Sequence, residues 1–214
     1  MVRTADLASG HMTTRLDIRE ETSDTLHEYA RIPIAFEVGS VVQARQAATS
    51  GAEFVLDERR LSMQFVKDYD AIPNNGPLDW PKRFDVTAWG FLAARSGGSR
   101  VGGATVVIHC PDVDMLEARD DLALLWDIRV APDVRGTGVG SALLAASEQW
   151  ALERGARWLK AETQNINAPA CRFYARHGFT LKTVNALAYP ELPYEIQFLW
   201  YKEISRTGAR AITA

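Results

Sequence analysis

The chain has 214 residues, of which 47% are hydrophobic and 24% are charged, as expected for a soluble globular protein built from one domain or from a domain with an extension. Its formal net charge is -3 at pH 7, which argues against a nucleic-acid partner because nucleic-acid-binding proteins usually present a basic surface. No apolar run reaches the length of a membrane span, and the N-terminus lacks the charged-then-apolar pattern of a signal peptide. We therefore expect neither a membrane partner nor a secreted protein.

The cysteine and histidine content indicates neither disulfides nor a metal site. Cys110 and Cys171 are too few for a disulfide framework, so we expect two reduced thiols in a cytoplasmic protein. The four histidines show no spacing typical of metal ligands, and no metal is expected.

The two ends of the chain carry no clear pattern. Residues 1–12 include Ser9-Gly10-His11-Met12, which resembles a cloning junction, and we expect them to be a disordered tail or a cloning remnant. Residues 13–204 are predicted to form a single domain, and residues 205–214 a C-terminal tail.

Hydrophobic patterning and turn residues predict the other elements. A strand is expected over residues 32–38. It is expected at the edge of the sheet because Pro33 has no N–H group to donate to a neighbouring strand. Residues 41–70 are interpreted as mostly helical, and residues 71–81 as a loop because they contain three prolines. The acidic residues between 112 and 121 indicate a solvated turn or a negative field for a cationic substrate. Further strands are expected over residues 86–94, 100–109, 157–162, 179–184 and 196–204. This order predicts an α/β fold with a mixed, mostly antiparallel sheet and flanking helices.

The central feature is a strand, a glycine-rich loop and a helix in succession. The strand covers Leu124–Val130 and ends before Pro132. The loop Arg135–Gly140 leads into an amphipathic helix, for which Gly155 is placed as a C-terminal cap. Backbone amides at such a helix start bind phosphate or pyrophosphate. A tight turn without a ligand is the alternative for this motif taken alone.

Two motifs together resemble a known family. The first is the loop Arg135-Gly136-Thr137-Gly138-Val139-Gly140, which resembles the acyl-CoA pyrophosphate loop of the GNAT superfamily of N-acetyltransferases. The run from Asn167 through Ala170, Phe173 and Tyr174 to Gly178-Phe179 resembles the second signature of that superfamily. The resemblance covers residues 86–204 and implies the GNAT acyl-CoA N-acyltransferase fold. A dinucleotide-binding Rossmann unit is the rival for the first motif, but it has no place for the second one and the third glycine is missing.

A narrower resemblance lies in the C-terminal half. Residues 125–130, 162–171 and 189–201 are similar to streptothricin acetyltransferases, which acetylate the β-lysine amine of an antibiotic.

The resemblance implies a site and its co-substrate. Acetyl-CoA is expected to be bound by Ile128, Arg129, Val130, Arg135, Gly136, Thr137, Gly138, Val139, Gly140, Ser141, Asn167, Ala170 and Tyr174. Backbone amides of residues 128–130 would stabilise charge on the thioester oxygen. Asn167 would orient the pantetheine arm or simply cap its helix, and the Arg135 side chain would contact phosphate or face solvent. Tyr174 would protonate the leaving thiolate, or else be a packed aromatic whose hydroxyl bonds to the backbone.

The acceptor amine needs a base. An alkylamine has a pKa near about 10 and arrives protonated, so it must lose a proton before attack. Asp127 on the central strand and Glu162 on the next strand are the two candidates, acting directly or through water. Either side chain would alternatively hold the substrate cation, and a structural hydrogen-bonding role is the alternative for Asp127.

The sequence thus predicts an acetyl-CoA-dependent N-acetyltransferase for a primary amine of a small cationic acceptor, such as a streptothricin-type antibiotic. A protein or peptide N-acetyltransferase and a non-catalytic acetyl-CoA-binding sensor are the alternatives. The resemblance also implies a homodimer.

Overall fold

The computed structural model describes residues 3–5, 15–47 and 54–205. The segment that resembles a cloning junction and nearly all of the two predicted tails lie outside these residues. Eight strands form one sheet in the order β1-β2-β5-β6-β7-β8-β10-β9, and β3 pairs only with β4 in a separate ribbon. The strands are β1 (Arg3–Ala5), β2 (Leu16–Glu21), β3 (Phe36–Gln46), β4 (Phe54–Lys67), β5 (Gly90–Ser96), β6 (Ser99–Val107), β7 (Leu122–Val130), β8 (Trp158–Gln164), β9 (Thr180–Asn185) and β10 (Gln197–Glu203).

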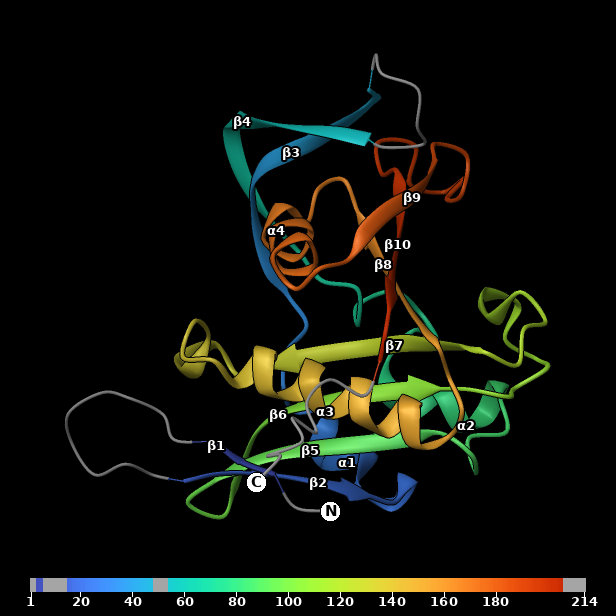
Figure 1. The fold of residues 1–214 in the computed structure, drawn as a ribbon. Coiled ribbons are helices and arrows are strands. Elements are labelled where there is room, and N and C mark those ends of the chain that lie inside the picture. Colours follow the sequence, from blue (N-terminus) through green and yellow to red (C-terminus); the bar gives the residue numbers. More distant parts are fainter. Residues whose placement is uncertain (1–2, 6–14, 48–53, 206–214) are drawn as a thin grey trace, which may run out of the picture.

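Helices flank both faces of the large sheet (Figure 1). The α-helices are α1 (Leu26–Tyr29), α2 (Trp80–Arg83), α3 (Val139–Glu153) and α4 (Ala168–Arg176), and the short 3-10 turns are η1 (Ser23–Thr25), η2 (Pro77–Asp79), η3 (Asp114–Leu116) and η4 (Pro132–Val134). Leu143 and Trp150 of α3 belong to the core on one face, whereas Tyr29 of α1 and Trp80 of α2 belong to the core on the other. This confirms the predicted mixed α/β fold. In the described part of the chain, no helix has the length and apolar character that a membrane crossing requires.

The predicted strand-loop-helix unit is confirmed. Strand β7 ends at Val130, η4 begins at Pro132, and α3 begins at Val139 after the glycine loop. Helix α3 ends at Glu153, two residues before Gly155. The strands expected over residues 86–94 and 100–109 correspond to β5 and β6, which form a hairpin with Ser96 paired to Ser99.

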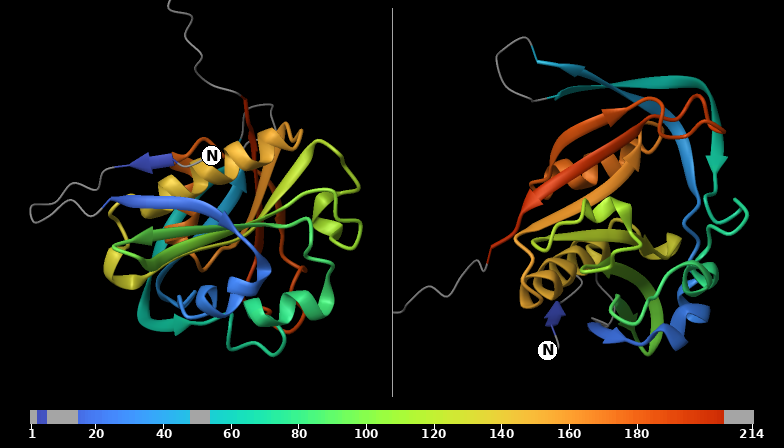
Figure 2. Two further views of the ribbon diagram at one scale, coloured as in Figure 1. Left: turned by 90° about the horizontal axis from the view of Figure 1, so that it is seen from below. Right: turned by 90° about the vertical axis from the view of Figure 1, so that its right-hand side faces the viewer.

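The helical interpretation of residues 41–70 is wrong. In the described part of this range, residues 41–46 continue β3 and residues 54–67 form β4, and the two strands pair as an antiparallel ribbon. Figure 2 shows this ribbon running beside α4 and the strands β8 to β10, away from the rest of the sheet. Leu56, Met63, Phe65 and Val66, which a helix would place on one side, do not form a core face. Met63 and Val66 are 81% and 70% exposed. Pairing with β3, which local periodicity does not reveal, decides the conformation. Residues 32–35 also precede β3 rather than belonging to it.

Candidate functional site

A gap between two strands creates the site. Strands β7 and β8 are parallel and pair only from Leu122↔Trp158 to Leu125↔Ala161. Beyond these residues the two strands diverge, so none of the described strands pairs with the β8-facing edge of β7 over residues 126–130. Unpaired backbone amides there are available to a bound ligand. A cavity of about 570 Å³ opens at this point, and Asp127, Ile128 and Glu162 line it.

The glycine loop lies beside the cavity. Gly136 and Gly138 have φ angles of 79° and 99°, a left-handed conformation that favours glycine. A Cβ atom added to Gly136 would meet no protein atom within 4 Å, so the backbone there is open to a ligand. Gly138 is also the N-cap of α3, where free N–H groups and the helix dipole attract anions. The loop therefore fits the pyrophosphate of an acyl-CoA.

Helix α4 presents Asn167, Ala170 and Tyr174 to the same cavity. The Asn167 side chain accepts a hydrogen bond from the backbone N–H of Ala170 at 3.1 Å, so it is the N-cap that the sequence predicts. At the other end the helix stops at Arg176, before Gly178.

Replacing Asn167 by alanine should remove this cap and lower the free energy of unfolding by about 1 kcal/mol. Urea denaturation followed by circular dichroism measures the change. Asn167→Asp keeps an oxygen acceptor and should retain most of the stability. Equal losses for the two variants would contradict the capping role.

Tyr174 has a free hydroxyl. The residue is 5% exposed, and its ring packs edge-on against Phe179 and lies near Trp200. Within the described part of the chain, its hydroxyl makes no hydrogen bond, although the side chain lines the cavity. Burial, followed by the nearby charge of Asp127, raises the pKa of this phenol above its ordinary value. The hydroxyl is thus a protonated donor that is not committed to the protein.

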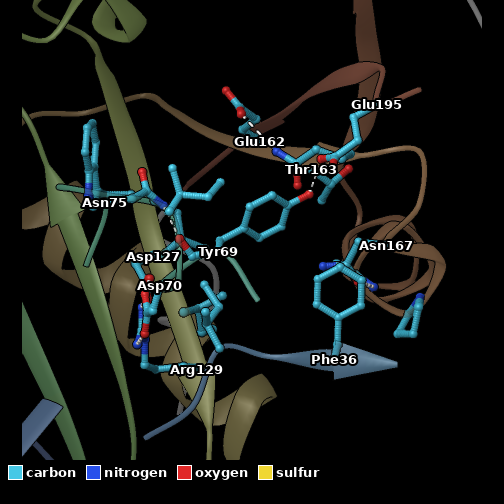
Figure 3. A pocket seen from close by; sticks show the side chains of 18 of the residues that line it. Phe36, Tyr69, Asp70, Asn75, Asp127, Arg129, Glu162, Thr163, Asn167 and Glu195 are labelled. Atoms are coloured by element: carbon cyan, nitrogen blue, oxygen red, sulfur yellow. Dashed lines mark hydrogen bonds and ion pairs between the residues drawn. The ribbon is translucent and has the colours of Figure 1, made fainter. Parts of the chain in front are cut away.

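Asp127 is committed to an internal network. Its Oδ1 accepts hydrogen bonds from the Tyr29 hydroxyl at 2.6 Å and from Arg129 Nε at 3.0 Å, and its Oδ2 accepts one from Arg129 Nη2 at 2.6 Å. Arg129 in turn donates to Asp70 Oδ2 at 2.7 Å. Figure 3 shows Asp70, Asp127 and Arg129 together on one wall of the cavity. Burial lowers the pKa of Arg129, but the charge and hydrogen bonds of Asp127 outweigh this and keep the guanidinium charged.

Breaking this network should destabilise the fold. Asp127→Asn removes a buried charge whose side chain is 6% exposed, and it leaves Arg129 with Asp70 as its only carboxylate partner in the network. We expect the free energy of unfolding to fall by up to about 3 kcal/mol. Urea denaturation measures it, with the exposed Asp112→Asn as the control, which should lie within about 0.5 kcal/mol of the parent. A stable Asp127→Asn that loses its rate at neutral pH, where the acceptor amine is protonated, would instead identify a base.

Glu162 lies on the other side of the cavity (Figure 3). It accepts hydrogen bonds from the Tyr189 hydroxyl at 2.5 Å, from Gln197 Nε2 at 2.7 Å and from Gln164 Nε2 at 3.1 Å. All three donors are neutral, and no described residue forms an ion pair with this carboxylate. The other carboxylates of the cavity, Asp70, Asp127 and Glu195, each have a cationic partner. Glu162 therefore carries negative charge that the described residues do not neutralise.

The Arg135 side chain, expected to contact phosphate or to face solvent, is bound to the protein backbone in the structure. Its guanidinium donates to three backbone carbonyl oxygens, those of Val130, Pro33 and Ala35, at 3.1–3.2 Å. Ser141, another predicted ligand, has its hydroxyl 2.9 Å from His177 Nε2. Ser141 therefore remains available to a phosphate chiefly through its backbone N–H group, whereas the backbone N–H of Arg135 donates to Pro132 O at 3.3 Å.

The sequence reasoning missed the third wall of the site. Glu195 is 7% exposed and pairs with Lys67, and it accepts a hydrogen bond from Tyr69 at 2.6 Å. This contact joins the end of β4 to the segment between β9 and β10, which also supplies Tyr189. No local signal identifies these residues, because they meet Glu162 and one another only in the folded chain.

Cys110 and Cys171 are both free, as the sequence predicts, and the structure shows that both are buried. Burial raises the pKa of Cys171 to about 11, so this thiol stays protonated at neutral pH and is a poor nucleophile. Within the described residues, no group of three or more His, Cys, Asp or Glu side chains is arranged to hold a metal ion.

The fold and the two motifs are those expected of the GNAT superfamily, and the comparison with known families agrees. The model of the acetyltransferase (GNAT) family matches residues 58–179, and the chain belongs to this family. A streptothricin acetyltransferase of Streptomyces lavendulae is 30% identical over 140 residues, which are 65% of this chain and 70% of that relative.

Other relatives match a shorter region. Streptothricin acetyltransferase A of Bacillus subtilis (strain 168) is 46% identical over 81 residues, or 37% of this chain and 47% of the relative. A streptothricin acetyltransferase of Escherichia coli is matched over 53% of its length. The chain therefore spans about half the length of these two curated relatives.

Solved structures share the fold. A nourseothricin acetyltransferase superposes with a TM-score of 0.67 at 24% identity, covering 89% of this chain and 99% of that one. A Bacillus anthracis (strain Ames) protein solved in complex with acetyl coenzyme A has a TM-score of 0.71 at 23% identity, covering 88% and 99%.

Proposed function

We propose that the protein is an acetyl-CoA-dependent N-acetyltransferase that acetylates a primary amine of a small cationic acceptor of the streptothricin type. The observation that carries the proposal is the pairing, in one cavity, of an unneutralised carboxylate with an uncommitted phenol. In this proposal Glu162 holds and deprotonates a cation, and Tyr174 gives a proton to a leaving group. The streptothricin acetyltransferases among the relatives support the choice of acceptor.

Acetyl-CoA would supply the acetyl group as a thioester. The proposed contacts for the pyrophosphate are the backbone N–H groups of Gly136 and of residues 138–141, because those of Arg135 and Thr137 already donate to backbone carbonyl oxygens. The free edge of β7 over Ile128, Arg129 and Val130 is proposed to bind the pantetheine and the thioester oxygen, beside Asn167 and Ala170. N–H donors fixed by a sheet stabilise developing negative charge without reorganising.

The acceptor enters as an ammonium ion, which the charge of Glu162 attracts. We propose that Glu162, directly or through a water molecule, takes one proton from the nitrogen. The neutral amine then forms a bond to the thioester carbon, and the carbon–sulfur bond breaks. Tyr174 gives its proton to the departing thiolate, and the proton lost from the acylated nitrogen restores the phenol. Glu162 releases its proton to solvent, so the sum is one acetamide, one thiol and one proton.

In this proposal Asp127 has a different role from Glu162. Each of the two carboxylates accepts three hydrogen bonds, but Asp127 is paired with the charged Arg129, whereas the donors to Glu162 are all neutral. We therefore propose that Asp127 orients Arg129, which holds the wall that carries Asp70.

The cavity walls favour a small acceptor over a folded protein. Residues from before β3, from after β4 and from between β9 and β10 all line the cavity. We also propose a cytoplasmic location, which agrees with two buried free thiols, and a homodimer, for which light scattering of the purified protein is the test.

The proposed function is tested by thiol release from acetyl-CoA with streptothricin, with other small amines, with a peptide that has a free N-terminus, and with no acceptor. We expect release with streptothricin well above the blank. Thiol release with the peptide alone would indicate a protein or peptide N-acetyltransferase instead. Binding of acetyl-CoA without thiol release in any mixture would indicate a non-catalytic sensor.

A further inference from the structure

A short stretch of the cavity wall has no regular structure of its own. Residues 32–35, here called the wall segment, connect α1 to β3 and belong to neither a helix nor a strand. Pro33 and Ile34 line the cavity directly, as does the following Phe36. Since a segment without a backbone ladder is positioned by its side-chain contacts, the partners of its carbonyl groups determine where this wall stands.

Two arginines bind these carbonyl groups. Arg129 Nη1 donates to Ile32 O at 3.1 Å. Arg135 Nη2 donates to Pro33 O at 3.1 Å and to Ala35 O at 3.2 Å. Three of the four carbonyl groups of the wall segment thus accept from guanidinium donors, and charge-assisted bonds of this kind are stronger than neutral ones.

Arg135 is also the first residue of the glycine loop. Its Nε donates to Val130 O, the last residue of β7, at 3.1 Å. A guanidinium is planar and rigid, so its three hydrogen bonds fix the positions of the three carbonyl groups relative to one another. One side chain therefore joins the end of β7, the start of the loop and the wall of the cavity.

We propose that the Arg135 side chain is a positioning residue that fastens the acceptor wall to the acetyl-CoA loop, while the phosphate contacts of this loop come from its backbone N–H groups. The inference rests on the proposed acetyl transfer, because it assigns the loop to acetyl-CoA and the wall to the acceptor. Its consequence is a coupling between the two substrates. Acetyl-CoA that holds the loop also holds the wall, so acceptor binding depends on Arg135 although the acceptor does not touch it.

Kinetics of Arg135→Met and Arg135→Lys separate this role from phosphate binding. Methionine removes all donors, and lysine keeps the charge but cannot reproduce the planar fork. We expect both variants to raise the acceptor KM by about tenfold, consistent with the loss of two or three hydrogen bonds of which water replaces a part. The Kd of acetyl-CoA should change less than about twofold. The exposed Arg59→Met on β4 is the control and should leave both constants unchanged.

A second measurement does not depend on turnover. Hydrogen exchange followed by mass spectrometry reports the peptide that spans the wall segment. Acetyl-CoA should slow its exchange in the parent protein, and Arg135→Met should speed the exchange and abolish the effect of acetyl-CoA. This result stands or falls independently of thiol release, so failure of the proposed acetyl transfer and failure of the inference are distinguishable. The inference is overturned by unchanged exchange in Arg135→Met, or by an acetyl-CoA Kd raised tenfold in Arg135→Met but restored in Arg135→Lys.

Discussion

Glu162→Gln is expected to lower kcat/KM for a streptothricin-type acceptor by about 10²-fold or more, the range that a positioned general base contributes. Glutamine keeps the size of the side chain, and its amide oxygen still accepts the hydrogen bond from Tyr189, so the cavity should retain its shape. What is lost is the one cavity carboxylate without an ion-pair partner among the described residues. Both the attraction of the ammonium and the removal of its proton therefore weaken together.

Thiol release over a range of acceptor concentrations measures this effect. Glu153→Gln, on the exposed face of α3, is the control and should match the parent protein. The Kd of acetyl-CoA should be the same in all three proteins, because Glu162 serves the acceptor. If Glu162→Gln retains full kcat/KM while Asp127→Asn loses it without loss of stability, the base is Asp127.

Tyr174→Phe is expected to lower kcat by about 10²-fold, in line with the loss of a general acid. The ring contacts with Phe179 and Trp200 do not need the hydroxyl, so the fold and the Kd of acetyl-CoA should be nearly unchanged. Isothermal titration with acetyl-CoA and thiol release measure the two quantities separately. Turnover equal to that of the parent protein would remove Tyr174 from the reaction.

The same side chain predicts a pH profile. Burial, followed by the charge of Asp127, raises the pKa of Tyr174 above the ordinary value of about 10. A raised pKa keeps the phenol protonated to higher pH, so kcat should not fall through loss of this proton below about pH 10. A decline of kcat near pH 8 that disappears in Tyr174→Phe would contradict the assigned environment.

The parts of the site that local sequence determines were predictable. The strand, glycine loop and helix follow one another within residues 124–153, and the Asn167 cap lies three residues from the amide it binds. Their signals are turn chemistry and periodicity, which act over a few residues. The acceptor side depends on contacts between distant residues. Tyr29 meets Asp127 across 98 positions, and Gln197 meets Glu162 across 35.

The failed helix prediction has the same cause. The apolar residues of β4 repeat at intervals compatible with a helix, and only pairing with β3 makes them a strand. The role of Asp127 shows the limit for site residues as well. Position on the central strand brings its carboxylate to the cavity, but the Tyr29 and Arg129 partners that occupy its oxygens decide what it is free to do.

The most direct test of the account is the product itself. Purified protein is incubated with acetyl-CoA and streptothricin, and mass spectrometry with fragmentation locates any added acetyl group, with Glu162→Gln and Tyr174→Phe run in parallel. The account predicts one acetyl group on a primary amine of the antibiotic, formed by the parent protein and strongly reduced in both variants. An unmodified antibiotic after full incubation, or equal acetylation by all three proteins, would contradict it.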